Sequence, residues 1–130
     1  MSSVQDCPCG SKKQFKQCCG RFLDQGQQAK TPEQLMRSRF SAYALGGYGK
    51  YLLQTWLPAT APDLNEVELS VPDVQWQQLQ IVDKSQKGDD GNVEFKAHFI
   101  NKQGEPEVMH EKSVFKRIAG RWLYIGGEVS

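Results

Sequence analysis

The stretch CPCGSKKQFKQCCG, residues 7–20, contains all four cysteines of the 130-residue chain and decides how its N-terminal end folds. The spacing is Cys-x-Cys, then eight residues, then Cys-Cys. Disulfides fit it poorly, because a bridge within either close pair would be strained. Four thiolates around Zn²⁺ instead form a closed tetrahedral site of the structural kind. We therefore predict that residues 1–22 form a zinc knuckle with four ligands: Cys7, Cys9, Cys18 and Cys19.

The residues between the cysteines favour a metal site over the alternative of four unrelated buried thiols. Pro8 stiffens the first turn, and Gly10 lets the backbone fold over the sulfurs so that amide N–H groups point at them. Four thiolates on a divalent cation leave a charge of about −2, which neighbouring lysines can offset. Basic groups around an aromatic ring also suit an acidic protein partner or ribosomal RNA. We predict a partner-binding surface formed by Lys12, Lys13, Phe15, Lys16 and Arg21.

Charge and hydropathy exclude several classes of protein. The net charge of +1 argues against a general nucleic-acid binder, and we expect no recognition of DNA sequence. Residues 1–30 carry five basic and two acidic side chains, so a basic head precedes a mildly acidic body. No stretch approaches the roughly 18 apolar residues of a membrane span. The first residues lack the apolar segment of a secretory signal, so we expect a cytoplasmic location, where thiols stay reduced.

After the knuckle, residues 23–30 are polar and nonperiodic, which predicts a linker. Thr31 is a suitable N-cap for a helix, Pro32 suits its first position, and Gln34 completes a capping box. This helix is expected to end at Gly46. Two further helices are predicted, one over residues 48–57 and a short one over 64–67.

Arg39 is the unexpected residue of the first predicted helix. It falls within the apolar face, whereas Arg37, Ser38 and Ser41 lie on the opposite face. A buried guanidinium is costly without a partner, and Glu111 shares the inward face of its predicted strand. Three hypotheses remain: a buried ion pair that fixes the helix on the sheet, an Arg39 that reaches solvent, or a pocket for a small anionic ligand. The pocket hypothesis takes four residues: Arg39, Tyr43, Glu111 and Ser113.

From Val74 onward apolar and polar residues alternate, which predicts β-strands. The strands are predicted around 79–81 and over 93–99, 107–118 and 121–126, with turns at 87–92, 101–106 and 119–120. Helices followed by hairpin-linked strands indicate an α+β domain over residues 31–130, with helices on one face of a curved antiparallel sheet.

Two groups of residues resemble known families. Residues 7–20 resemble the SEC-C motif, the zinc knuckle at the C-terminus of the preprotein translocase ATPase SecA, although many copies have His where this chain has Cys19. The chain as a whole resembles the bacterial YchJ family, because a knuckle is followed by four short stretches that are similar to those of the family. These stretches are MRSRFSAY (36–43), TW (55–56), EKSVF (111–115) and WLY (122–124). One departure from the pattern of the YchJ family is Leu57, which stands after the Trp where a His is expected.

The resemblances carry expectations about fold and function. The YchJ family implies a nuclear-transport-factor-2-like (NTF2-like) body in which helices lie against a cone-shaped sheet. The knuckle of SecA contacts the export chaperone SecB and has ribosome-related counterparts, which implies an adaptor. The sequence thus favours a zinc-binding adaptor with a protein or ribosomal partner. The alternative is a small-molecule-binding protein or enzyme that uses a cone pocket near Arg39 and Glu111, although the sequence contains no known catalytic motif.

Overall fold

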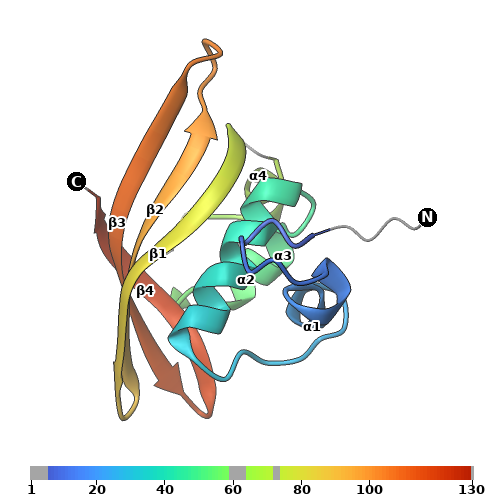
Figure 1. Cartoon of the computed structure of the whole chain (residues 1–130). Coiled ribbons are helices and arrows are strands. Elements are labelled where there is room, and N and C mark those ends of the chain that lie inside the picture. The colour runs from blue at the N-terminus through green and yellow to red at the C-terminus, as the bar shows by residue number, and fades with distance from the viewer. Residues whose placement is uncertain (1–5, 59–63, 72–73, 130) are drawn as a thin grey trace.

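The computed structural model describes residues 6–58, 64–71 and 74–129. The N-terminal half contains helices: η1 (Phe15–Gln17, a 3-10 helix), α1 (Gly20–Leu23), α2 (Pro32–Leu45), α3 (Gly49–Gln54) and α4 (Glu66–Leu69). Four strands follow: β1 (Gln75–Lys87), β2 (Asp90–Ile100), β3 (Pro106–Ile118) and β4 (Arg121–Val129). The helices lie together on one side of a strongly twisted sheet (Figure 1). The predicted α+β architecture is confirmed.

The sheet is an antiparallel meander in the order β1-β2-β3-β4. The β3–β4 turn, Ala119-Gly120, is the predicted tight turn, and both residues have positive φ, as a two-residue hairpin turn requires. The predicted turn over 87–92 is too long, because Asp90 already pairs with Lys87. Arg117 of β3 holds this corner: its backbone N–H donates to the Asp89 carbonyl at 2.7 Å, and its Nε donates to Asp89 Oδ1 at 2.8 Å.

Helix α2 begins where its sequence predicts. The hydroxyl of Thr31 accepts a hydrogen bond from the Gln34 backbone N–H at 3.1 Å, and the Gln34 side chain accepts one from the Lys30 N–H. The helix ends at Gly46, whose φ is +75°. The other two helices differ from the predictions in extent: α3 ends at Gln54, and α4 begins two residues later than expected.

The main core lies between α2 and the concave face of the sheet. Leu35 and Phe40 of the helix and Val93, Phe95 and Phe115 of the strands are each at most 4% exposed. One close approach fixes the distance between the layers. A Cβ atom at Gly91 would lie 2.3 Å from Cγ of Pro32, so a glycine is needed where the first turn of α2 meets β2.

The face of α2 opposite the sheet is buried as well. Ser38 and Ser41 are 0% exposed. The Ser38 hydroxyl donates to the Leu35 carbonyl at 2.8 Å and lies 2.6 Å from the hydroxyl of Tyr51 on α3. The Ser41 hydroxyl lies 3.5 Å from the sulfur of Cys7. The knuckle therefore packs on this side of α2, and the helix is the middle layer of three (Figure 1).

Candidate metal centre

The four cysteine sulfurs lie within 4.8 Å of one another, and each cysteine is at most 7% exposed. A tetrahedral site with Zn–S bonds of about 2.3 Å separates its sulfurs by about 3.8 Å. The Cys9 and Cys18 sulfurs are 3.6 Å apart, close to that value. The structure thus brings together all four predicted ligands, Cys7, Cys9, Cys18 and Cys19, and their chemistry fits one tetrahedral metal ion.

A tight loop positions the first two cysteines. The Cys7 N–H donates to the Lys13 carbonyl at 2.8 Å, and the Gly10 N–H donates to the Cys7 carbonyl at 3.3 Å. Gly10 has a φ of +81°, which suits glycine, and a Cβ atom there would lie 3.0 Å from the Leu79 carbonyl oxygen of β1. Gly10 therefore both turns the loop and allows it to approach the sheet.

The sulfurs strongly affect one another's ionisation. Hydrogen bonds from Cys19 and Cys9 lower the pKa of the Cys7 thiol to about 3. Hydrogen bonds with Cys7 and Cys9 raise the pKa of the Cys19 thiol, and burial raises it further. The Cys7 thiolate thus forms easily, but the Cys19 thiol resists losing its proton. A bound cation removes this conflict, because its positive charge stabilises all four thiolates together.

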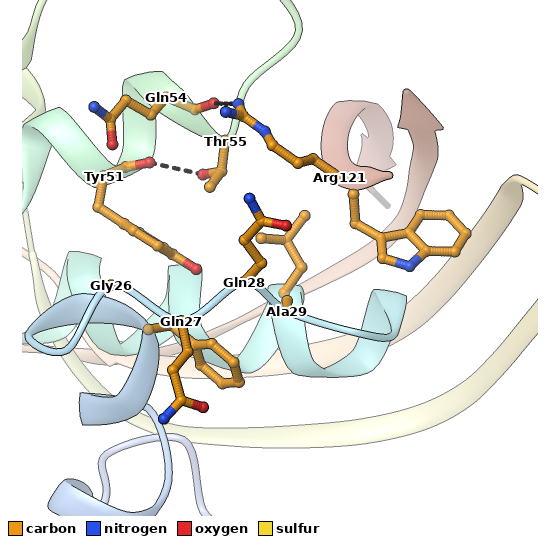
Figure 2. Close-up of a pocket in the computed structure, with 11 residues that line it drawn as sticks. Gly26, Gln27, Gln28, Ala29, Tyr51, Gln54, Thr55 and Arg121 are labelled. Atoms are coloured by element: carbon orange, nitrogen blue, oxygen red, sulfur yellow. Dashed lines mark hydrogen bonds between the residues drawn. The ribbon is translucent and has the colours of Figure 1, made fainter. Parts of the chain in front are cut away.

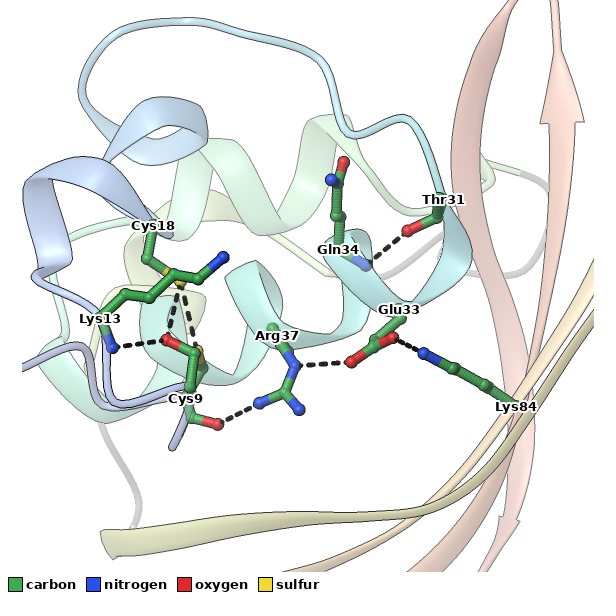
Figure 3. Close-up of polar contacts among 9 residues, drawn as sticks. Cys9, Lys13, Cys18, Thr31, Glu33, Gln34, Arg37 and Lys84 are labelled. Carbon is green, nitrogen blue, oxygen red and sulfur yellow. Dashed lines mark hydrogen bonds and ion pairs between the residues drawn. The ribbon is translucent and has the colours of Figure 1, made fainter.

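Arg37 supports the cluster from α2, a role that could not be predicted from the sequence. Its Nη1 donates to the Cys9 carbonyl at 2.7 Å, and its Nε donates to Glu33 at 2.9 Å (Figure 3). Glu33 in turn contacts Lys84 of β1. Burial opposes the charge of Arg37, but its bonds to Glu33 and Cys9 outweigh burial and raise its pKa. The i,i+4 spacing of Glu33 and Arg37 was visible in the sequence, whereas the contact with Cys9 was not.

Comparison with known proteins assigns the chain to a family. Residues 5–21 match the model of the SEC-C motif, and residues 31–127 match that of the YchJ middle NTF2-like domain. The chain belongs to the YchJ family. A UPF0225 protein of Bordetella pertussis is 41% identical over 135 residues, covering 98% of this chain and 96% of the relative. One from Streptomyces coelicolor is 38% identical, covering 94% of each.

A solved structure agrees with this assignment. The solution structure of a SEC-C motif containing protein from Rhodopseudomonas palustris matches with a TM-score of 0.87 at 34% identity, covering 97% of this chain and 99% of the other. The family and the NTF2-like fold expected from the sequence are therefore confirmed. Among the described helices of this YchJ-family chain, none has the length and apolar character needed to cross a membrane.

The five residues of the predicted partner surface do not all face outward. Lys12, Lys13 and Lys16 are exposed. Phe15 is half-buried and packs toward the core, with its ring over Gly20. Arg21 folds back onto the knuckle, where its Nε donates to the Cys18 carbonyl at 3.0 Å. The exposed basic surface is therefore made of three lysines.

Three of the four predicted pocket residues, Arg39, Tyr43 and Glu111, line a cavity of about 260 Å³ between α2 and the sheet. Ser113 does not line this cavity, but its hydroxyl donates to the Glu111 carboxylate. Arg39 is 2% exposed, so it does not reach solvent. Within the described ranges, no ion pair joins Arg39 to Glu111; Arg39 Nη1 instead donates to the Leu52 carbonyl at 2.8 Å and to Thr55 Oγ1 at 2.7 Å.

A second, smaller hollow of about 180 Å³ lies beside the predicted linker. Gln27 and Gln28 of the linker line it, the Gln28 side chain points toward α3 across it, and Arg121 of β4 closes one end by donating to the Gln54 carbonyl at 3.2 Å (Figure 2). None of the predicted site residues lines this hollow.

Proposed function

We propose that the chain is a zinc-binding adaptor whose knuckle contacts an acidic protein partner or the ribosome. The observation that carries the proposal is a closed cluster of four buried cysteines with Lys12, Lys13 and Lys16 exposed on the loop between them. Four sulfur ligands leave no open coordination position, so the ion acts as a scaffold for this loop. The positive φ of Lys12, +67°, supports this role, because a non-glycine residue keeps such a conformation only when its surroundings impose it.

The identity of the ion is the first part of the proposal. Thiolate sulfur favours soft or borderline ions, and zinc is the usual ion of closed four-cysteine sites. We expect one zinc per chain in protein purified without added metal, measured by inductively coupled plasma mass spectrometry. Stoichiometric iron, or a cluster that stays metal-free when zinc is offered, would contradict the proposal. A cytoplasmic location is proposed with it, because reducing conditions keep the four thiols available.

The partner is the second part of the proposal. Reversing the charge of Lys12 and Lys13, both to Glu, should abolish salt-sensitive retention of ribosomes or acidic proteins in a pull-down from native lysate. Lys96 and Lys102 provide a matched control, because both are exposed on or next to the sheet and their reversal changes the net charge equally. Retention that survives the knuckle reversal, or that both pairs of substitutions abolish alike, would rule out a specific knuckle surface.

A further inference from the structure

The cavity between α2 and the sheet has a mostly aromatic wall with charge at one end. Rings of Phe40, Trp76 and Phe95 contribute apolar surface, and Arg39 and Glu111 also line the space. The Trp76 ring is fixed between two others, with centroids 5.9 Å from Phe40 and 5.1 Å from Phe99. Small-molecule sites in proteins combine such apolar walls with a few convergent polar groups.

Arg39 carries a buried charge whose hydrogen bonding is incomplete. Both of its hydrogen bonds use Nη1, so Nε and Nη2 have no hydrogen-bond partner among the described residues. The guanidinium carbon lies 4.8 Å from the ring centroid of Trp56 and 4.7 Å from that of Tyr124. Ring faces stabilise a cation, but they accept no in-plane hydrogen bond. Two donor positions of Arg39 are therefore left for another group.

Glu111 does not satisfy those donors. Its Oε2 accepts hydrogen bonds from the Ser113 hydroxyl and from the Tyr124 hydroxyl, the latter at 2.9 Å. Gly127 on β4 makes room for this arrangement, since a Cβ atom there would lie 2.5 Å from the same oxygen. The carboxylate is thus held by neutral donors beside Arg39 and not paired with it.

A second unsatisfied donor lies in the same wall. Among the side-chain nitrogens and oxygens of residues 6–58, 64–71 and 74–129 that are completely shielded from solvent, Nε1 of Trp56 is the one without a hydrogen-bond partner. Trp56 lines the cavity and touches Arg39 through its ring. Buried donors without acceptors are rare and costly. Two residues that line the same cavity, Arg39 and Trp56, thus carry donors without a partner, which indicates an acceptor from outside the chain.

We propose that this cavity binds a small carboxylate with an apolar body, its oxygens on Arg39 Nε and Nη2 and its body among Phe40, Trp76 and Phe95. A guanidinium binds a carboxylate through two parallel hydrogen bonds, and the low polarity of the site strengthens both. The volume of about 260 Å³ limits the ligand to about one ring or a short chain. This inference is independent of the adaptor function.

The indole N–H signals of ¹⁵N-labelled full-length protein test the proposal. Phenylacetate and hexanoate, titrated to about 10 mM as suits weak ligands of this size, should shift the Trp56 and Trp76 signals in a saturable way. The Trp122 signal is the internal control, because this indole lies outside the cavity and donates to the Lys30 carbonyl at 3.2 Å. The neutral analogues phenylacetamide and hexanamide should bind at least about tenfold more weakly.

Two variants and one control variant separate the charge of Arg39 and the donor of Trp56 from simple packing. Arg39→Met should weaken phenylacetate binding at least about tenfold. Trp56→Phe keeps a ring and removes the donor, so it should weaken binding about fivefold, whereas Trp122→Phe should leave it unchanged. Absence of saturable shifts with both acids, or equal affinity for acid and amide, would overturn the proposal even if Arg39→Met fails to fold. Equal effects of the two Trp variants would also overturn it.

Discussion

At the scale of single residues, two positions join the knuckle to the rest of the molecule. Gly10 lies so near the Leu79 carbonyl of β1 that an added Cβ atom would be 3.0 Å from its oxygen, and Arg37 of α2 donates a hydrogen bond to the Cys9 carbonyl. Both contacts are made to backbone atoms, so they constrain the path of the loop whatever side chains it carries. Each of these two close approaches can be disturbed by one substitution that leaves the four cysteines in place.

Gly10→Ala should destabilise the chain and speed the loss of metal. A side chain at φ +81° costs about 1–2 kcal/mol, and the Cβ atom would crowd the Leu79 carbonyl as well. Thermal unfolding and the rate of zinc transfer to a chromogenic chelator measure the two effects. Gly26→Ala is the matched control, because Gly26 has a φ of +75° and open space around it. Equal losses in both variants would mean that the contact with β1 contributes nothing.

Arg37→Met should weaken metal binding about tenfold, as is usual when a residue behind a metal ligand is removed. The variant loses the hydrogen bond to Cys9 and leaves Glu33 with Lys84 alone (Figure 3). Competition with a chelator of known zinc affinity gives the change. Lys84→Met, which removes only the exposed end of this chain of contacts, should have little effect. A larger effect at Lys84 than at Arg37 would contradict the role of the backbone contact.

At the scale of elements, α2 shows what could be predicted from the sequence and what could not. Its start depends on Thr31 and Gln34, which are neighbours in the chain, and the prediction was correct. The burial of Ser38 and Ser41 depends on Tyr51 and Cys7, which lie 13 and 34 residues away. Helical periodicity shows which face of a helix carries polar side chains, but it does not show which other elements pack on that face. The burial of the second face of α2 could therefore not be predicted.

Thr31→Ala should lower the free energy of unfolding by about 1 kcal/mol, because it removes the acceptor for the Gln34 N–H. In a chain of this size that corresponds to a fall in melting temperature of about 3–5 °C. Asn65→Ala removes the equivalent cap from α4, a helix of four residues without buried side chains, and should cost less. Calorimetry of both variants gives the comparison. A greater cost at Asn65 would show that the start of α2 is held by packing, not by its cap.

At the scale of the whole molecule, the four cysteines belong to the same buried cluster as the residues between α2 and the sheet. The four ligands were predictable because they are close in sequence, and the burial of Arg39 was predictable from its place on the helix. Its partners, Leu52 and Thr55, were not, because they depend on how α3 docks. The division into residues 1–22, 23–30 and 31–130 stays a prediction about the organisation of the chain.

Because the cluster is shared, removal of the metal should lower the melting temperature of the whole chain in one transition. Protons compete with the metal for thiolates, so acidification should have the same effect as a chelator. Near-ultraviolet circular dichroism follows the tryptophans of the sheet side, and addition of zinc should restore the original transition. A sheet signal that melts at an unchanged temperature after metal removal would show that the knuckle and the remaining domain are energetically separate.

The knuckle, α2 and the sheet follow one another in space in the same order as along the chain, and this order has a consequence for synthesis. The knuckle leaves the ribosome first, α2 second and the sheet last. At about 5–20 residues per second, the cysteines wait on the order of a second or more for the helix that carries Arg37 and Ser41. Each of these layers can therefore pack on a layer that has already been synthesised, and none has to insert between two layers that are already folded.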